Sequence, residues 1–287
     1  MSNSYDSVRE KIRARANKNS DLAQAMLRTF MMERFMERVS VSQYRDRFIL
    51  KGGLLVSSLV GVDLRSTMDI DATVRALPVN HEETRRIIEE IAGIDIGDNV
   101  SFDVGKSVTI MHEHDYQGIR FLMRATMGGA WQPLAIDIST DDVITPGAIE
   151  YEMPLLLEDR TINVLAYNNE TLLAEKIHSV ISHGEENTRM RDFYDLYTFV
   201  MSPLVSFDYN LLAQALHATV SHRGDEKDLN KIREIASRIA DFPQMPERWE
   251  RFCTENEYAS QLSWRDVAET LLNIVSEVSE RFSENTT

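Results

Sequence analysis

The chain has 287 residues, of which 43 % are hydrophobic and 8 % aromatic, a composition that is ordinary for a globular protein with a substantial core. Its 31 basic and 46 acidic residues give a formal net charge of −15, which argues against general coating of nucleic acid through a broad basic surface. Cys253 is the only cysteine, so an intramolecular disulfide and a Cys–His zinc cluster are excluded. No apolar run reaches the roughly 18 residues of a membrane helix and no signal-peptide core is visible, so we expect a cytoplasmic protein without membrane contact.

The first part of the chain predicts two helices, at residues 6–18 and 20–40. The first of these carries a local basic patch within an otherwise acidic protein. This patch is either a solvated helix face or a local contact for nucleic acid. Its members are Arg9, Lys11, Arg13, Arg15 and Lys18.

The rest of the chain is organised around residues 48–71, FILKGGLLVSSLVGVDLRSTMDID. The apolar run at 48–50 predicts a strand, and the Gly52–Gly53 turn leads into an apolar segment of helical character, 54–60. Amide groups at the start of a helix point outward at the positive end of the helix dipole, where phosphate binds. The pattern therefore indicates a phosphate-binding turn, although a Gly–Gly pair by itself is more typical of an ordinary turn.

Two carboxylates, Asp69 and Asp71, flank Ile70 at the end of this stretch. In a strand, side chains at i and i+2 point to the same side, so the carboxylates project together while Ile70 faces the core. Such a pair repels itself unless a cation lies between the two groups, and hard oxygen ligands of this kind suit Mg²⁺ in phosphate chemistry. The alternative is an acidic pair that simply faces solvent.

A third carboxylate stands out further along the chain. After an expected helix at 81–92, residues 101–140 form short runs rich in β-branched and apolar residues, which predict strands. Asp137 lies between two isoleucines inside one of these runs. Burying a charge there is unfavourable unless the charge is paired or bound to a metal, so Asp137 is expected to complete a metal site with Asp69 and Asp71.

Residues 170–201 predict two helices. In the first helix Lys176 lies within the apolar stripe, where it either extends its ammonium group to solvent or contacts a phosphate. His178 falls off this stripe and is expected to be exposed. In the second helix Asp192 borders the core face. A helix surface stabilised by its own ion pairs is the alternative interpretation of this cluster.

The C-terminal part is helical and carries little recognisable chemistry. Periodic apolar residues predict helices at 208–221, 225–240 and 261–282. The expected organisation has three parts: an N-terminal helical segment at 1–47, a core at 48–200 and a C-terminal helical region at 201–287.

Several segments, in this order, resemble the AbiEii/AbiGii toxin family, the nucleotidyltransferase component of bacterial abortive-infection toxin–antitoxin systems. These segments are FILKGG, R-x-T-x-D-I-D (Arg65, Thr67, Asp69 and Asp71), YQGIRF, LAIDIST, ITPG, AYNNETLLAEK and RMRDFYDLY. The resemblance covers about residues 48–200, and its last two segments are the most specific.

The resemblance implies an α+β nucleotidyltransferase fold related in its core to DNA polymerase β. A mixed sheet is expected, flanked by N-terminal helices and a C-terminal helical region. It also implies a Mg²⁺-dependent toxin that transfers NMP from an NTP to an acceptor hydroxyl. The 3′ end of tRNA is the implied acceptor, and its modification blocks translation. An antitoxin and a role in phage defence by abortive infection are implied in the same way.

The family motifs assign roles to individual residues of this chain. Asp69 and Asp71 match the metal-binding pair, which holds one or two Mg²⁺ ions, and Asp137 occupies the place of the third carboxylate of the wider superfamily. Lys176 matches the lysine expected to contact the triphosphate. Asp192 matches the acidic residue of the family's final motif.

The phosphate side of the expected site departs from the family pattern at one position. Gly52 and Gly53 match the phosphate-side turn, and Arg65 is expected to help offset charge on the leaving pyrophosphate. A hydroxyl residue commonly follows or replaces the second glycine, but this chain has Leu54 there. Ser57, or the serine after it, lies one helical turn further on and is expected to substitute.

Two other functions remain open at this point. The acceptor hydroxyl can belong to a protein, which the acidic net charge makes reasonable. The chain can also be a nucleotide-binding regulatory module without catalysis, although the intact set of three aspartates and a lysine speaks against that alternative.

Overall fold

A computed structural model of the chain describes residues 4–63, 65, 67–77, 80–112, 116–140, 142–225, 229 and 231–284. Its contacts group the chain into two compact units. Unit 1 comprises Met1–Asp142 and Ala148–Ala166, and unit 2 comprises Val143–Gly147 and Tyr167–Thr287. The expected partition at residues 47/48 and 200/201 stays a prediction.

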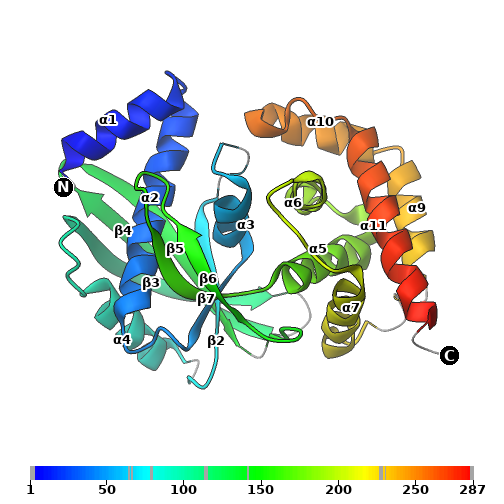
Figure 1. The fold of residues 1–287 in the computed structure, drawn as a ribbon, viewed down its shortest axis with the longest axis horizontal. Helices are drawn as coiled ribbons and strands as arrows, with labels where there is room; N and C mark the ends of the chain where they lie inside the picture. Colours follow the sequence, from blue (N-terminus) through cyan, green and yellow to red (C-terminus); the bar gives the residue numbers. More distant parts are fainter. Residues whose placement is uncertain are drawn as a thin grey trace. The chain divides into compact units, whose positions relative to one another are not determined.

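Unit 1 is built on a seven-stranded sheet with the order β3-β4-β5-β2-β1-β7-β6 (Figure 1). The strands are β1 (Phe48–Lys51), β2 (Asp69–Val74), β3 (Val100–His112), β4 (Tyr116–Met127), β5 (Ala130–Thr140), β6 (Ile149–Pro154) and β7 (Thr161–Ala166). β2 pairs in parallel with β5 and β1 in parallel with β7, whereas the other neighbours are antiparallel. The mixed sheet confirms the predicted α+β class.

Four helices accompany this sheet: α1 (Tyr5–Ala16), α2 (Ser20–Val41), α3 (Gly52–Val60) and α4 (His81–Ala92). α2 crosses one face of the sheet, where it contacts β5 and β7, and α1 packs against α2 (Figure 1). Side chains of Ser4, Asn19 and Asn80 cap the starts of α1, α2 and α4 by accepting backbone N–H groups. These helices confirm the elements predicted for the N-terminal part of the chain.

One face of the sheet packs against α2, and this contact identifies which side chains project from the opposite face. Gln132 on β5 bonds to Gln24 of α2, and Phe102 on β3 packs edge-on against Phe35 of α2 at 5.6 Å. Side chains alternate along a strand, so Asp137, an odd number of residues beyond Gln132, projects from the face away from α2.

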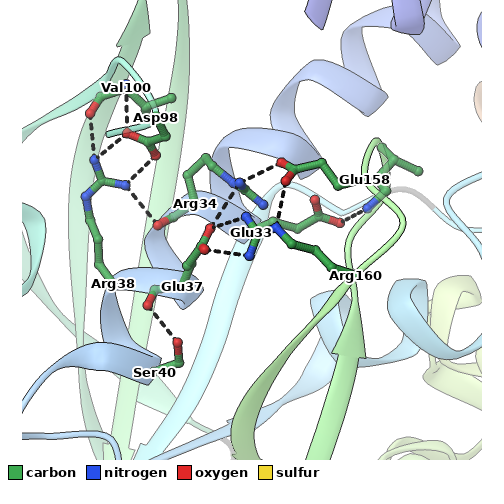
Figure 2. A network of polar contacts seen from close by, with 10 residues as sticks. Glu33, Arg34, Glu37, Arg38, Ser40, Asp98, Val100, Glu158 and Arg160 are labelled. Atoms are coloured by element: carbon green, nitrogen blue, oxygen red, sulfur yellow. Dashed lines mark hydrogen bonds and ion pairs between the residues drawn. The ribbon is translucent and has the colours of Figure 1, made fainter. Parts of the chain in front are cut away.

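An ionic network ties α2 to two distant segments of unit 1 (Figure 2). Arg38 makes a two-point contact with Asp98 at 2.7 and 2.9 Å, just before β3. One turn earlier, Arg34 pairs with Glu158, in the loop between β6 and β7, at 2.8 Å. Both arginines are almost fully buried, so the network fixes how α2 meets the sheet.

Unit 2 is helical. Its α-helices are α5 (Asn169–His183), α6 (Met190–Met201), α7 (Tyr209–Arg223), α9 (Ile232–Asp241), α10 (Met245–Glu255) and α11 (Trp264–Glu284). An aromatic cluster joins three of them: the Trp264 ring lies 5.3 Å from Phe193 of α6 and 6.2 Å from Trp249 of α10. Across the described part of the chain, no helix combines the length and apolar character needed to cross a membrane.

Three elements differ from the sequence prediction. The β6–β7 hairpin was not predicted; in β6, the edge strand of the sheet, exposed Glu150 and Glu152 alternate with the other residues and leave only a short apolar pattern. Helix α10 was also missed; Pro246 lies in its first turn, where a proline is well tolerated, although proline in the middle of a helix would break it. α9 begins at Ile232, later than the expected start at residue 225; residues 226–228 and 230 lie outside the described part.

The network in Figure 2 contains a carboxyl group that is expected to make stability depend on pH. Complete burial raises the pKa of Glu33 from 4.5 to about 8, although a hydrogen bond from the Leu156 amide opposes the shift. The folded protein thus holds this proton between pH 4.5 and 8 while the unfolded chain does not. Stability is therefore lost as pH rises through this window.

We expect Glu33→Gln to remove this contribution, since an amide replaces the protonated acid without a titrating group. The free energy of unfolding of Glu33→Gln minus that of wild type should increase by up to about 1.4 kcal/mol for each pH unit between pH 5 and 8. Urea unfolding at several pH values measures it, with Glu37→Gln as the control. A difference that does not change with pH would contradict the prediction.

Candidate active site

The two aspartates of β2 are presented as the sequence predicts. Ile70 between them is 1 % exposed and belongs to the core, whereas Asp69 and Asp71 are half-buried on the opposite side of the strand. Alternation along the strand therefore places both carboxylates on the same face of the sheet.

Asp137 joins this pair through strand register. β5 runs parallel to β2, and Asp137 lies directly beside Asp71 across the two strands. Neighbouring strands are about 4.8 Å apart, so the backbones of the three carboxylates fall within a few ångströms of one another. Asp137 is 5 % exposed, which agrees with the expectation of a buried charge that requires a partner.

The partner of Asp137 is Arg120 on β4. Arg120 lies opposite Asp137 in the antiparallel ladder and donates from Nε to Oδ1 at 2.7 Å and from Nη2 to Oδ2 at 2.6 Å. The same Nη2 donates to Oδ2 of Asp69 at 3.2 Å. The hydrogen bond to Asp137 is the main cause that raises the pKa of the guanidinium, which stays fully charged. One cation thus bridges two of the three carboxylates.

Asp71 is held by the glycine turn. The Gly53 amide, at the start of α3, donates to Oδ2 of Asp71 at 3.1 Å. No side chain caps α3 from its own N-cap position, so this carboxylate serves as the anion at the helix N-terminus. Gly52 has φ +61°, and a Cβ atom on it would lie 2.2 Å from the same oxygen. The glycine therefore allows Asp71 to approach the backbone closely.

The second glycine of the turn makes room for two side chains of the R-x-T segment. A Cβ atom on Gly53 would lie 2.4 Å from Oγ1 of Thr67 and 2.5 Å from Nη1 of Arg65. Arg65 is 3 % exposed, so it packs beneath the turn. Ser57, one turn along α3, is also 3 % exposed, and its hydroxyl has no hydrogen-bond partner among the residues described.

Lys51, the last residue of β1, is paired with Asp142 at 2.6 Å. Burial alone would raise the pKa of Asp142, but the charge of Lys51 and hydrogen bonds from Lys51 and Ser139 outweigh it and hold this pKa at about 2. The ion pair thus joins Asp142, which follows β5, to the end of β1 just before the glycine turn.

The remaining predicted residues lie in unit 2. Lys176 on α5 pairs with Asp192 at 2.6 Å and with Asp195 at 2.9 Å, both on α6. Ser179 donates to the second oxygen of Asp192 at 2.8 Å. Lys176 keeps 17 % of its side chain exposed, so it lies at the edge of the helix interface rather than inside it. The predicted residues therefore form two sets, one in each unit.

The fit of a divalent cation differs among the three carboxylates. Asp69 and Asp71 offer hard oxygen donors on one face of a strand, which suits Mg²⁺. Both oxygens of Asp137 are already bonded to Arg120. Among the described residues, no cluster of three or more His, Cys, Asp or Glu side chains is arranged to hold a metal ion. The donor set of the β2 pair fits the ion, whereas Oδ2 of Asp69 and both oxygens of Asp137 accept hydrogen bonds from Arg120.

Two residues of these clusters were not predicted from the sequence. Arg120 is a charged residue between Ile119 and Phe121, and the argument that singled out Asp137 applies to it equally. Asp195 follows Asp192 by three residues, so helical spacing places both on one face of α6. Both signals were present in the sequence.

A match to a family model defines the class of protein. A model of a nucleotidyltransferase family, described as "Nucleotidyl transferase AbiEii toxin, Type IV TA system", matches residues 34–284. The chain belongs to this family, which confirms the resemblance and extends it beyond residues 48–200. It is therefore a nucleotidyltransferase with an NTP as substrate, of a kind that is paired with an antitoxin.

Solved structures with similar folds have low sequence identity to this chain. JHP933 from Helicobacter pylori is 15 % identical, with a TM-score of 0.48, and the match covers 92 % of this chain and 95 % of that chain. An antigenic nucleotidyltransferase-like protein from Paracoccidioides brasiliensis is 18 % identical, with a TM-score of 0.38, over 69 % of this chain and 93 % of that chain. None of the curated proteins compared matches the chain.

We expect Gly52→Ala to damage the site through Asp71. Its positive φ adds roughly 1–2 kcal/mol of backbone strain, and the clash with the carboxylate adds about 1–3 kcal/mol more. Gly61→Ala is the matched control, because Gly61 has φ +100° but no atom within 4 Å of the added Cβ. Urea unfolding and nucleotide transfer should both be worse for Gly52→Ala. Equal effects of the two substitutions would contradict this account.

A second prediction separates a structural from a catalytic role for Lys176. Lys176→Met removes the ammonium group that is bonded to both Asp192 and Asp195, which should lower the free energy of unfolding by on the order of 3 kcal/mol. Lys176→Met/Asp195→Leu should recover most of that stability without recovering activity. Recovery of both would show that the lysine only stabilises the helix pair.

Proposed function

We propose that this protein transfers NMP from an NTP, in a Mg²⁺-dependent reaction, to the 3′-terminal hydroxyl of tRNA. The modified tRNA cannot be charged, so translation stops in the cytoplasm, and an antitoxin restrains this activity until phage infection triggers abortive infection. One observation carries the proposal: β2 and β5 pair so that Asp137 lies beside Asp71, with Asp69 on the same face, at the N-terminus of the glycine-turn helix. Family membership supplies the reaction class.

In this reaction the acceptor oxygen forms a bond to the α-phosphorus, and the bond between that phosphorus and the bridging oxygen of pyrophosphate breaks. Mg²⁺ bound by Asp69 and Asp71 would supply positive charge beside the reacting phosphate. Asp137 is suited to accept the proton of the attacking hydroxyl or to serve as a further ligand. The helix N-terminus at Gly52 favours the phosphate tail electrostatically.

Cationic side chains would offset charge on the leaving pyrophosphate. The family motif assigns this role to Lys176, with Arg65 beside the glycine turn assisting. Both cations lie in partly or fully buried positions, where charge interactions are stronger than in water. Asp192 holds the ammonium group of Lys176 in place.

The basic patch on α1 gives only limited support for an RNA acceptor. Lys11 and Arg15 donate to the carbonyl oxygens of Leu157 and Leu156, so two of its five cations bind the β6–β7 loop. The case for tRNA therefore rests mainly on family membership. A protein hydroxyl is the competing acceptor.

The test incubates the purified protein with each α-labelled NTP in turn, in the presence of total tRNA or total protein, and sequences the tRNA 3′ ends. Label is expected in tRNA, from a restricted set of NTPs. Asp69→Asn should reduce transfer by on the order of 100–1000-fold, whereas Asp103→Asn, at an exposed aspartate of β3, should be unaffected.

Other outcomes distinguish the alternatives. Label that enters protein instead of tRNA would identify a protein acceptor. NTP binding without transfer by either wild type or Asp69→Asn would show a non-catalytic nucleotide-binding module. Transfer that persists in EDTA would remove the metal from the mechanism.

A further inference from the structure

The guanidinium of Arg120 lies among the carboxylates that a divalent cation would have to contact. Its guanidinium binds both oxygens of Asp137 and one oxygen of Asp69, with three donor–acceptor distances between 2.6 and 3.2 Å. This set includes two of the three carboxylates assigned to the metal. Arg120 is therefore a cation already present in the site.

Strand register explains why the site has this cation. Arg120, Asp137 and Asp71 lie in one row across β4, β5 and β2, since each is the direct partner of the next. All three side chains project from the face away from α2. The row would otherwise place negative groups side by side without an opposite charge, and the arginine neutralises part of that repulsion.

A guanidinium and a divalent cation compete for the same carboxylate oxygens. Each Asp137 oxygen accepts one N–H of Arg120 and keeps a second lone pair, but the charge-assisted hydrogen bond weakens it as a metal ligand and the two cations repel each other. The Arg120 side chain is 37 % exposed, so solvent lies on one side of it and it has space to withdraw. The Arg120–Asp137 pair is therefore open to solvent on the arginine side, although Asp137 itself is buried.

We propose that Arg120 is a resident cation that closes the carboxylate site in the nucleotide-free protein and is exchanged for the divalent cation when the site loads. This inference rests on the proposed function, because it takes Asp69 and Asp137 as metal ligands. It assigns Arg120 a regulatory and positioning role that the family motifs do not assign.

The exchange has a functional consequence. While Arg120 is bound to it, Asp137 is a weaker base toward the acceptor hydroxyl and a weaker metal ligand through either bonded oxygen. Loading the site with the cation and the nucleotide frees Asp137, so the third carboxylate becomes available only when substrate is bound. A toxin with this arrangement holds its metal weakly until an NTP arrives.

The test measures binding of Mn²⁺, as a spectroscopic substitute for Mg²⁺, to the full chain without nucleotide. Arg120→Gln should bind Mn²⁺ on the order of tenfold more tightly than wild type, because charge-assisted hydrogen bonds no longer compete. Arg120→Lys, with a single point charge, should lie between them. Arg124→Gln is the control, since Arg124 lies four residues further along β4, over the Trp131 ring at 4.6 Å, and should bind like wild type.

Thermal unfolding supplies a second measurement if Arg120→Gln folds poorly. This variant should be less stable than wild type without Mn²⁺ and should gain more in Tm when Mn²⁺ is added. Asp69→Asn in either background should abolish both the binding and the gain. These results together would support the exchange.

Three outcomes would overturn it. Mn²⁺ binding that depends on Asp69 but is no tighter in Arg120→Gln removes the exchange and leaves the proposed function intact. Equal effects of Arg120→Gln and Arg124→Gln show a general charge effect rather than competition at the site. Absence of Mn²⁺ binding in wild type and Arg120→Gln, with transfer unaffected by EDTA, removes both this inference and the metal in the proposed function.

Discussion

Repulsion among carboxylates that the sheet itself brings together is the constraint on which the candidate site depends. The parallel β2–β5 pairing places Asp137 beside Asp71, and alternation along β2 adds Asp69 to the same face. Opposite charge must therefore come from elsewhere in the fold. Arg120 and the amide of Gly53 provide it, one from β4 and one from the start of α3. The aspartates, the arginine and the glycine turn make one electrostatic unit.

The glycine turn illustrates how one sequence feature serves two purposes. The sequence pattern suggests amide groups directed at a phosphate, whereas in the structure the Gly53 amide is bonded to Asp71. The helix N-terminus thus already has an anion, and a phosphate has to share or replace it. Absence of a side chain at Gly52 is what lets the carboxylate come so close to the turn. In the proposed site, metal binding by Asp71 and phosphate binding at the turn would therefore be coupled through the same oxygen atom.

The sequence was sufficient for features that depend on local spacing. Alternation around Ile70 predicted the shared face of its neighbours, and the apolar surroundings of Asp137 predicted burial. The register between distant strands could not be predicted from the sequence. The β2–β5 pairing joins Asp71 to Asp137, and no local pattern encodes which residues become partners over such a separation. Arg120 was missed for this reason, although its own apolar neighbours indicated a buried charge.

Helical spacing was less reliable than alternation in strands. His178 was expected to be exposed but is 3 % exposed, because Asp225 and Arg223 satisfy both ring nitrogens and allow the histidine to be buried. Ser57 was expected to contact phosphate because it lies one turn after the glycines. In the structure it is a buried residue of α3, 3 % exposed, and its position in the sequence did not indicate this burial. For His178 the deciding partners come from a segment that the local pattern does not contain.

Each of three cations in these clusters is bound to a carboxylate: Lys51 to Asp142, Arg120 to Asp137, and Lys176 to Asp192. An acidic protein that binds a triphosphate faces a particular difficulty, since phosphate must compete with its own carboxylates for every such cation. A divalent ion changes this balance, because it adds positive charge that the carboxylates attract rather than exclude. In the proposed reaction, the same excess of acid that disfavours broad binding of nucleic acid would therefore favour nucleotide that arrives together with its metal. Without that metal, each of these three cations is neutralised by a carboxylate of the same protein.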